Sequence, residues 1–380
     1  MGKVVVMNVC AKHPPYDGRV YQKISKTLLK CGYEVHNTSP NIDSGVTEDG
    51  IFLHGFRQGK GLLNRIGSFS RLKKSIEEVK PDCMFCHEPD ALMVAYRYYR
   101  KEKKRRNTKL FFDCHEAYEH WFDNITPIKP INRIAGVILM RIINYTVSRI
   151  DGVTSVNNTM TERFKKYNSN SYFLPSVYKI DNSDDYIENG STEVVYMGQF
   201  GNSKQKEMLL KAAKILKEKG ILVKVTIIGG EKRSDINADS FESIVQKEHL
   251  EEYFDIKGWM PAEEAFNLLP KYGVGMMRFD SYTMPGNYAM PNKLFEYMAY
   301  GLAILSCKLN LEIKQIIEEN QCGILLEKED GEDLANALLY IKEHTHNIIQ
   351  MKYNSFRVTA EKYNWDSYKS LLRQLVEGNP

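Results

Sequence analysis

Short runs of apolar and β-branched residues alternate with longer amphipathic runs along the 380 residues of the chain. In the first half the apolar runs lie at 3–9, 33–39, 81–86, 109–114 and 151–156. Helical patterns lie between them at 17–32, 91–106 and near 131–148. Strands that alternate with helices are typical of a doubly wound parallel sheet. We therefore expect an α/β domain, Rossmann-like, over residues 1–176.

The alternation is lost at 177–192, VYKIDNSDDYIENGST, and then begins again. Because that segment gathers Asn, Asp, Ser and Gly without apolar periodicity, it is expected to be an interdomain linker. Apolar runs then recur at 193–198, 222–230, 253–259, 274–279, 302–307 and 322–327, with helical patterns at 204–220, 262–273, 291–301, 311–320 and 330–343. A second Rossmann-like domain is expected over 193–360, followed by a C-terminal helix at 361–380 that packs back on the first domain.

Composition describes a globular chain, with 43% hydrophobic and 26% charged residues. No stretch approaches ~20 uninterrupted apolar residues, so no transmembrane helix is expected, and the N-terminal run is interpreted as a buried strand rather than a signal peptide. Seven cysteines, an odd number, favour a reducing compartment and a cytoplasmic protein. Cys83 and Cys86 form a C-x-x-C inside a predicted strand, where side chains three apart point to opposite faces, so no shared metal or redox site is expected.

Charge divides the chain unequally. Residues 1–180 hold 29 Lys and Arg against 17 Asp and Glu, a net +12, and the remaining residues are net −8. Such a split predicts that the first half meets an anionic partner. Stretches 56–80 and 125–149 mix basic with bulky apolar residues, which suggests peripheral binding to an anionic bilayer, although ordinary packing on the sheet is the role expected for 131–148. Nucleic acid is not an expected partner, because no interleaved aromatic platform accompanies the basic residues.

The stretch PNKLFEYMAYG, residues 291–301, predicts a helix with a defined start and stop. Pro291 suits the first turn of a helix and Gly301 suits its C-terminal end. Three first-turn amides would then point outward at the mouth of a cleft, where a helix N-terminus attracts phosphate: Asn292, Lys293 and Leu294. Glu296 could accept hydrogen bonds from a ligand diol. The alternative is a capped amphipathic helix with a Lys293–Glu296 pair.

Several motifs are spread along the chain. In the second half they are VVYMGQFGNSKQKEMLLKAAKIL, VTIIGG, IKGWMP, PNKLFEYMAYGLAILS and CGILLE; in the first half they are HPPYDGRV, DCMFCHEPDAL, KLFFDCHE and DGVTSVNNTMTERF. In their order and spacing these motifs resemble the family 4 retaining glycosyltransferases, especially members that build bacterial surface polysaccharides. The resemblance covers nearly the whole chain. It implies the GT-B fold, two Rossmann-like domains that face a central cleft for a nucleotide sugar.

The resemblance also implies roles for individual residues. It places Glu296 on the nucleotide ribose, Lys204 on the donor phosphates and His115, in the DCHE motif, near the transferred sugar. Gly198 would allow the backbone to approach the diphosphate closely. The catalytic residues expected on this basis are His115, Lys204 and Glu296, and the donor-binding residues are Gly198, Gln199, Lys204, Asn287, Tyr288, Ala289, Met290, Asn292, Lys293, Leu294 and Glu296.

Two positions depart from the family pattern. The family has a glutamate eight residues before the ribose glutamate, where this chain has Tyr288, and an arginine after the first glycine, where this chain has Gln199. The first departure removes an acceptor near the sugar hydroxyls, and the second removes a cation near the leaving group. We expect Lys204, Lys293 and the helix N-terminus to supply the positive charge, and backbone amides of 287–290 to replace the missing carboxylate.

Residues near other strand ends are candidates for the acceptor side: His13, Asp17 and Arg19 after the first strand, and His87 and Glu88 after another. Turn chemistry is the alternative for the first three, and a polar loop with a helix cap for the other two. Asp113 and Glu116 flank His115 and are expected to orient it. No Asp-x-Asp motif occurs, so no metal is expected on the diphosphate, and the acidic stretch EKEDGED at 327–333 is interpreted as an exposed helix start.

The resemblance therefore implies a retaining glycosyltransferase, and the absence of an Asp-x-Asp motif predicts that it needs neither a metal nor another cofactor. It would move a sugar from a nucleotide sugar, most simply UDP-linked, to a glycan or a lipid-diphosphate-linked acceptor in bacterial polysaccharide biosynthesis. Its place would be the cytoplasm or the inner face of the cytoplasmic membrane. Two alternatives stay open: a GT-B sugar-nucleotide epimerase, and a donor-binding subunit that has lost catalysis and supports a partner transferase.

Overall fold

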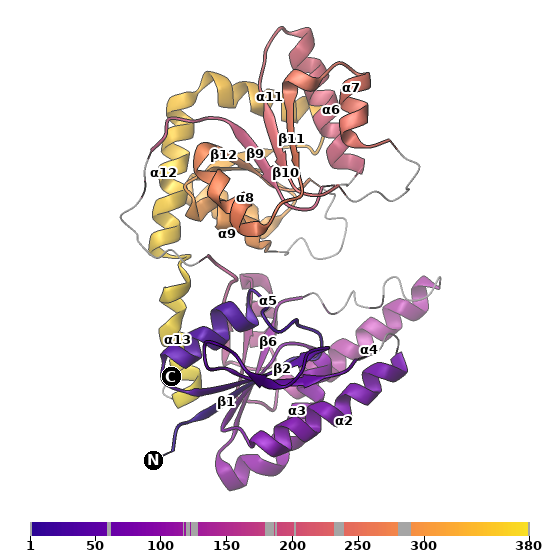
Figure 1. Cartoon of the computed structure of the whole chain (residues 1–380), viewed down its shortest axis with the longest axis vertical. Helices are drawn as coiled ribbons and strands as arrows, with labels where there is room; N and C mark the ends of the chain where they lie inside the picture. Colours follow the sequence, from indigo (N-terminus) through magenta and orange to yellow (C-terminus); the bar gives the residue numbers. More distant parts are fainter. Residues whose placement is uncertain are drawn as a thin grey trace. The chain divides into compact units, whose positions relative to one another are not determined.

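The computed structural model describes residues 2–58, 62–116, 118, 122, 128–178, 186, 188–200, 203–231, 239–279 and 290–378. The chain divides into two compact units (Figure 1). Unit 1 contains Met1–Pro175 and Trp365–Pro380, and unit 2 contains Ser176–Asn364. Within the described residues, no helix is both long and apolar enough to cross a bilayer.

Unit 1 is built on an eight-stranded sheet in the order β3-β4-β2-β1-β5-β6-β7-β8. All neighbouring pairs are parallel except β3 and β4. Its strands are β1 (Val5–Val9), β2 (Glu34–Pro40), β3 (Gly45–Val46), β4 (Phe52–Phe56), β5 (Cys83–Cys86), β6 (Lys109–Cys114), β7 (Gly152–Ser155) and β8 (Ser171–Phe173). Its helices are α1 (Lys26–Lys30), α2 (Leu62–Val79), α3 (Pro89–Arg106), α4 (Lys129–Val147), α5 (Asn158–Lys165) and α13 (Lys369–Glu377). The predicted doubly wound architecture is confirmed.

The central strands of unit 1 are buried on both faces, which explains their nearly continuous apolar runs. Strand β5 shows the consequence for the C-x-x-C pair. Cys83 and Cys86 are both buried, but only Cys86 belongs to the cluster formed by Leu72, Ile76 and their neighbours. The two thiols therefore lie in a strand, as predicted, where they point to opposite faces.

The first predicted helix of unit 1 begins in an unusual form. Residues Val20–Ser25 form a π-helical turn, and α1 continues from it. Hydrogen bonds from the amide of Gln22 to the carbonyl of Asp17, and from Ile24 to Arg19, span five residues and close the wider turns. Because wider turns change the direction in which side chains project, the amphipathic pattern alone did not predict this geometry.

Helix α4 is only partly covered by its own unit. Leu139, Ile143 and Val147 pack into the core, as expected for this segment. Its other side exposes Ile134 and Ile138 among several apolar side chains. As expected, one face of this helix packs into the core of unit 1. Its other face is exposed, which the sequence did not predict.

Unit 2 contains a six-stranded, entirely parallel sheet in the order β11-β10-β9-β12-β13-β14. Its strands are β9 (Val194–Met197), β10 (Val225–Ile228), β11 (Phe254–Gly258), β12 (Val274–Met276), β13 (Ala303–Cys307) and β14 (Gly323–Leu326). Its helices are α6 (Ser203–Glu218), α7 (Phe241–Lys247), α8 (Ala262–Leu268), α9 (Asn292–Ala299), α10 (Leu311–Asn320), α11 (Gly331–Glu343) and α12 (Thr345–Glu361). Figure 1 shows α6 and α11 packed together on one side of the sheet and α9 with α12 on the other. In chain order the strands read 3-2-1-4-5-6, the Rossmann arrangement.

The C-terminal segment returns to unit 1. Trp365, which is buried, donates from Nε1 to Thr27 Oγ1 at 2.8 Å. Tyr33 donates to Glu377 Oε1 at 3.1 Å, which fixes the end of α13 beside β2. These contacts explain why the last residues belong with the first unit rather than with the residues that directly precede them.

Candidate active site

A cavity of about 870 Å³ opens at the carboxyl ends of β9, β10 and β11 in unit 2. The lining residues are Met197, Gly198, Gln199, Ile228, Gly229, Gly230, Glu231, Trp259, Met260, Ala262, Ala265, Phe266, Lys293 and Glu296. The strand order reverses beside β9, and ligands of parallel sheets bind outside the carboxyl ends of strands at such a point. The cavity thus lies where this architecture favours a ligand.

Helix α9 brings two charged residues to this cavity. Pro291 caps the helix with an extended backbone, one position before the first turn that the sequence predicted for it. Gly301 has φ of +68° just beyond the C-terminal end, as expected for a glycine stop. Lys293 and Glu296, in the first turns, both line the cavity. The sequence therefore located the start of this helix correctly to within one residue.

Tyr297 fixes α9 against the sheet. The amide of Met197, at the end of β9, donates to the Tyr297 hydroxyl at 2.7 Å. A Cβ at Gly275, in β12, would lie 2.4 Å from the Tyr297 ring, so only glycine lets the ring pack so closely. This anchoring holds Lys293 and Glu296 in place, because they share the short helix with Tyr297.

Gly198 and Lys293 meet although they are far apart in the sequence. Gly198 has φ of +123°, and a Cβ there would lie 2.7 Å from Lys293 Nζ. The same ammonium group lies 4.3 Å from the centroid of the Tyr196 ring, a favourable cation–π geometry. A glycine backbone and a fixed cation at one edge of the cavity form a site suited to a phosphate group.

Other residues predicted around α9 have different positions. Leu294 is fully buried, and its amide donates to the Pro291 carbonyl at 3.1 Å, so that amide is not directed at a ligand as predicted. Met290 is buried and Asn292 is exposed. Asn287, Tyr288 and Ala289 lie outside the described residues. Gln199 lines the cavity, and its carbonyl accepts from the Tyr196 hydroxyl at 2.7 Å.

Lys204 has a partner that the sequence did not suggest. It lies in the first turn of α6 and forms an ion pair with Glu329, whose side chain is 1% exposed. Cys307 Sγ also donates to this carboxylate at 3.1 Å. Lys204 does not line the cavity as far as the described residues define it. The interpretation of 327–333 as an exposed helix start is correct for Asp330, which caps α11, and wrong for Glu329, because a buried carboxylate needs the neighbouring ammonium group.

Trp259 is a residue that our sequence analysis did not single out. It follows β11, lines the cavity and is 77% exposed, the highest exposure among the large apolar side chains of the described residues. An exposed indole beside a cavity is a suitable surface for a flat ring to stack on. The only sequence signal was a tryptophan as the last residue of a predicted strand.

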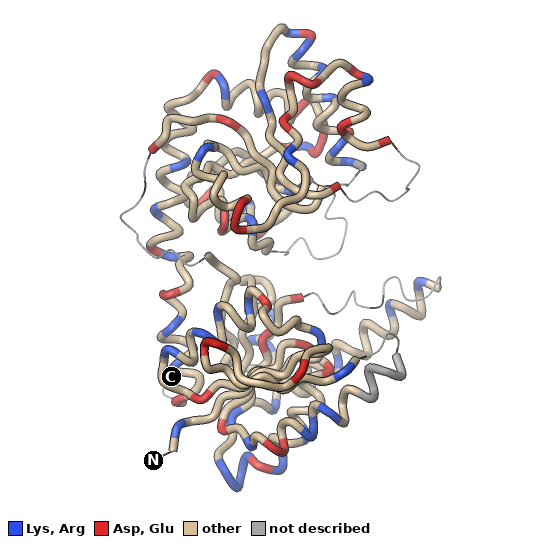
Figure 2. The backbone as a smooth tube through the Cα atoms, in the orientation of Figure 1, with Lys and Arg blue, Asp and Glu red and all other residues tan. Residues whose placement is uncertain are grey.

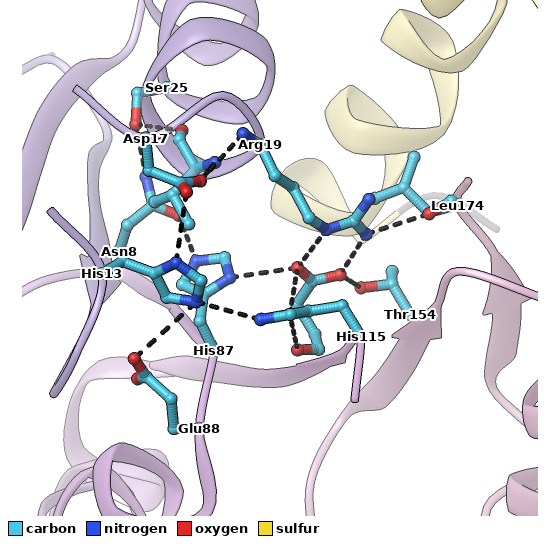
Figure 3. A network of polar contacts seen from close by, with 12 residues as sticks. Asn8, His13, Asp17, Arg19, Ser25, His87, Glu88, His115, Thr154 and Leu174 are labelled. Atoms are coloured by element: carbon cyan, nitrogen blue, oxygen red, sulfur yellow. Dashed lines mark hydrogen bonds and ion pairs between the residues drawn. The ribbon is translucent and has the colours of Figure 1, made fainter. Parts of the chain in front are cut away.

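Unit 1 has a separate polar cluster at the carboxyl ends of β1, β5, β6 and β7 (Figure 3). Asp113, fully buried in β6, lies at its centre. Arg19 donates to both oxygens, from Nε at 2.8 Å and from Nη2 at 2.6 Å. Thr154 donates to Oδ1 at 2.6 Å, and His87 Nδ1 lies 3.0 Å from Oδ2. Four segments are thus tied together by one carboxylate.

The charge of Asp113 is compensated within this cluster. Burial opposes ionisation, but the Arg19 guanidinium and the hydrogen bonds from His115 and His87 outweigh it and hold the pKa of Asp113 well below its usual value. His87 is also fully buried, and burial lowers its pKa despite the contact with Asp113. Arg19 is therefore primarily a structural cation here, although it was predicted as an acceptor-side residue.

His13 and His115 form a connected pair. His13 Nε2 lies 2.9 Å from His115 Nε2, and His13 Nδ1 lies 3.3 Å from Asp17 Oδ2. His115 Nδ1 lies 3.2 Å from the carbonyl of Asp113, which can only accept. If His115 Nδ1 carries the proton for that carbonyl, its Nε2 must accept from His13. His13 then has protons on both nitrogens, which is the imidazolium form.

The surroundings of His13 favour this charged form. Burial acts to lower its pKa, but the hydrogen bond to Asp17 and the charge of Glu88, whose Oε1 lies 3.7 Å away, raise the pKa above its usual value. Glu88 is itself held by the amides of Ala11 and Lys12, each at 2.8 Å. The structure thus brings together the predicted residues His13, Asp17, Glu88 and His115, and the surroundings favour the charged form of His13.

Three groups of this cluster are close enough to hold a metal ion: His87, Asp113 and His115. Their atoms already have other partners, however. Both oxygens of Asp113 accept from Arg19, and His87 Nε2 lies 3.1 Å from Asn8 Oδ1. Because a guanidinium occupies the position beside the carboxylate that a cation would need, this donor set does not fit a metal.

Replacing Asp17 by Asn should make the stability of unit 1 depend less on pH. A histidine with a raised folded-state pKa contributes stability that is fully present below its unfolded value of about 6.5 and is lost as the pH rises through the folded value. The loss of stability caused by D17N should therefore be larger at pH 5.5 than at pH 8.5, measured by urea unfolding at both values. The control is D49N, because Asp49 is paired with Lys26 and Tyr21 rather than with a histidine. Equal losses for D17N at the two pH values would contradict the assignment.

Comparisons with known proteins agree with this two-unit organisation. Residues 18–171 match the model described as Glycosyltransferase Family 4, and residues 191–344 match the model described as Glycosyl transferases group 1. An uncharacterized glycosyltransferase of Haemophilus influenzae is 24% identical over 255 residues, which are 66% of this chain and 65% of that protein. The match thus spans slightly less than two thirds of that relative.

Solved structures show the same fold at low identity. Sucrose-phosphate synthase of Thermosynechococcus elongatus has a TM-score of 0.68 at 15% identity, covering 99% of both chains. HepE of Anabaena, solved in complex with UDP-glucose, has a TM-score of 0.62 at 12% identity, also covering 99% of both chains. At such identities the likeness establishes the fold alone. The fold is thus that of the GT-B glycosyltransferases, and the first and second halves of the chain match the models described as Glycosyltransferase Family 4 and Glycosyl transferases group 1.

Proposed function

We propose that the chain is a retaining glycosyltransferase that takes a sugar from a nucleotide sugar and transfers it to a glycan or a lipid-linked acceptor. The observation that carries the proposal is the cavity of unit 2, where one helix presents both Lys293 and Glu296 beside the glycine backbone at Gly198. Lys293 supplies a cation, and the backbone at Gly198 can approach a ligand closely, which together suit a diphosphate. Glu296, one helical turn after Lys293, supplies a carboxylate that suits a ribose diol.

The cavity has a place for each part of such a donor. We assign the diphosphate to Lys293 and the backbone at Gly198, the ribose to Glu296 and the base to the exposed face of Trp259. A cavity of about 870 Å³ lies in the usual range for ligands of this size, about 300–1,000 Å³. Uracil is the base we favour, and UDP the nucleotide, since the similar structure of HepE holds UDP-glucose.

We propose a retaining reaction at this site. The bond between the anomeric carbon and the diphosphate oxygen breaks, and its electron pair leaves with the diphosphate. An acceptor hydroxyl attacks from the same face, forms the new glycosidic bond and passes its proton to a diphosphate oxygen, which retains the configuration. Charge develops on the leaving group, and Lys293 is positioned to stabilise it without a metal. Lys204, previously assigned to the phosphates, we now assign to neutralising Glu329.

We assign the acceptor to the polar cluster of unit 1. His115 and His13 are partly exposed at its edge, whereas His87 and Asp113 are buried beneath them. An imidazolium at His13 would attract the anionic groups of a phosphorylated or lipid-diphosphate-linked acceptor. We place the protein on the cytoplasmic side of a bacterial polysaccharide pathway, which agrees with seven free cysteines.

Calorimetric titration with UDP-, GDP-, ADP- and CMP-sugars tests the proposal. One class should bind far more tightly than the others, and the affinity should persist in excess EDTA, since no metal is needed. Release of the nucleotide should then require an acceptor. Tight binding without turnover across many acceptors would favour a non-catalytic donor-binding subunit, and interconversion of the sugar without acceptor would favour an epimerase. Absence of binding to all four classes would refute the assignment.

Replacing Trp259 by Ala should weaken nucleotide binding. Stacking of a base on an aromatic side chain contributes about 1–3 kcal/mol, so the dissociation constant should rise by roughly 5- to 150-fold. W259F should retain most of the affinity. Tyr353 is an exposed aromatic residue of the same unit that does not line the cavity, and Y353A should leave binding unchanged. Wild-type affinity in W259A would remove Trp259 from the base site.

A further inference from the structure

Helix α4 of unit 1 exposes a row of large apolar side chains. Seven of the 17 exposed large hydrophobic residues in the described part of the chain lie within residues 128–145. They are Ile128, Ile131, Ile134, Val137, Ile138, Ile142 and Tyr145, each between 41% and 59% exposed. Soluble monomers rarely expose contiguous apolar surface of this kind unless it has a partner.

The spacing shows that most of these side chains share one face. Residues 131, 134, 138, 142 and 145 follow one another at steps of three and four, which keeps them in one stripe of an α-helix. The side that packs into unit 1 contains different residues, among them Leu139, Ile143 and Val147. Helix α4 thus has a second apolar face, about 28 Å long for its 19 residues, that its own unit does not cover.

The charge around this face has one sign. Residues 128–149 contain no Asp or Glu, whereas Lys129, Arg133, Arg141 and Arg149 are all exposed. Figure 2 shows α4 in tan and blue only. The Arg149 guanidinium lies 3.6 Å from the centroid of the Tyr145 ring and donates to the Tyr145 carbonyl at 3.0 Å. A cation is therefore fixed at one end of the apolar stripe.

These features identify the partner by its chemistry. An apolar stripe flanked by cations, on a helix that is not apolar enough to cross a bilayer, is the pattern of a helix that lies in an interface. Long basic side chains can place their stems along the apolar face and their charges in the headgroup layer. A second copy of the chain fits poorly, because a symmetric contact would bring these cations against their equivalents with no carboxylate on either helix.

We propose that the outer face of α4 docks on an anionic lipid surface, with the helix parallel to the membrane plane. The stripe from Ile131 to Tyr145 enters the acyl boundary, and the four basic residues contact anionic headgroups. The docking requires no glycosyltransferase activity, so it can be tested whether or not the proposed donor and acceptor are correct.

Flotation of the full chain with lipid vesicles tests the docking. The wild-type protein should float with vesicles of equal parts phosphatidylglycerol and phosphatidylcholine, should remain unbound with phosphatidylcholine alone, and should lose binding as salt is raised. Each basic residue near an anionic surface contributes roughly a five-fold gain in partitioning, so R133E/R141E should bind at least about 30-fold more weakly. I134E/I138E should no longer float, because two carboxylates in the apolar stripe would prevent it from entering the acyl boundary.

Matched control variants distinguish docking through α4 from a general effect of the net charge of unit 1 or of exposed apolar residues elsewhere. K165E/K166E changes the net charge of unit 1 by the same amount at the C-terminal end of α5, and V46E places a charge at an exposed apolar residue of β3, outside the α4 stripe. Both should bind vesicles like the wild type. I134S/I138S, a milder change at exposed positions, should also lose binding while keeping the wild-type melting temperature, which guards against a folding defect in the glutamate variant.

Four results would overturn the proposal. They are equal flotation with neutral and anionic vesicles, no flotation of the wild-type protein with either, equal losses in the control variants, and a wild-type dimer that I134E/I138E dissociates while vesicle binding is unchanged. The last result would show that the apolar face binds a second copy of the chain.

Discussion

Replacing Glu296 by Ala should raise the dissociation constant for the nucleotide sugar at least about 100-fold. The carboxylate lines the donor cavity from a helix that Tyr297 holds against the sheet, so no neighbouring group can readily take its place. A hydrogen bond to a charged group contributes about 1.5–3 kcal/mol, and a ribose diol would make two of them with this side chain. Calorimetric titration of the variant with the donor identified for the wild-type protein measures the loss.

A ligand lacking one ribose hydroxyl distinguishes a ribose contact from a general disturbance of the cavity. The 2′- or 3′-deoxy form of the nucleotide should bind the wild-type protein more weakly, but should lose little further affinity in E296A, because the partner of the missing hydroxyl is already gone. Glu264 is exposed on α8 beside the cavity without lining it, and E264A should bind normally. Equal penalties for the deoxy nucleotide in the wild type and in E296A would show that Glu296 does not hold the ribose.

The long buried elements could be predicted because burial leaves a local pattern. Strands such as β6 and β13 are covered on both faces and therefore appear as continuous apolar runs. Strands β3, β4 and β8 were missed for the opposite reason. Gly45 and Val46 are exposed, β4 is buried at only two of its five residues, and β8 is only partly buried over three residues, so none of them produces a continuous apolar run.

Residues of the candidate site could be predicted together only where they lie in one short segment of the sequence. Lys293 and Glu296 lie three residues apart on one helix, and the proline and glycine around them mark its ends. Asp113 and Arg19 are 94 residues apart, and Lys204 and Glu329 are 125 apart. Pairing over such distances depends on the three-dimensional arrangement of strand ends, which hydrophobic periodicity does not encode.

Two ion pairs with buried carboxylates, Arg19–Asp113 and Lys204–Glu329, changed our interpretation of residues that the sequence had marked as functional. Arg19 and Lys204 were both expected to meet a ligand, Arg19 because it follows the first strand and Lys204 because the family resemblance implied it. In the structure each neutralises a buried carboxylate of its own unit. A buried acid in a predicted strand, such as Asp113, was the available signal that a nearby cation had a structural partner.

Replacing Arg19 by Met should destabilise unit 1 by about 3–5 kcal/mol. Asp113 is fully buried, and the methionine would leave its charge without the guanidinium that compensates it. Urea unfolding can be followed for unit 1 alone in a W259F background, because the other tryptophans, Trp121 and Trp365, belong to unit 1 by sequence. The matched control is R106M, which removes an exposed arginine 3.6 Å from Asp82 and should cost less than about 1 kcal/mol.

The pH dependence identifies the unpaired carboxylate as the cause of this loss. A carboxyl group with a lowered folded-state pKa contributes stability that is present above its unfolded value of about 3.9 and is lost as the pH falls through the folded value. In R19M burial is no longer opposed by the guanidinium, so Asp113 takes up a proton more readily and its charge disappears on acidification. The difference in stability between the wild type and R19M should therefore shrink from pH 7 towards pH 4, and R19M/D113N should be less destabilised than the sum of the single variants. A difference that stays constant with pH, together with additive single effects, would mean that Arg19 acts through packing rather than through the charge of Asp113.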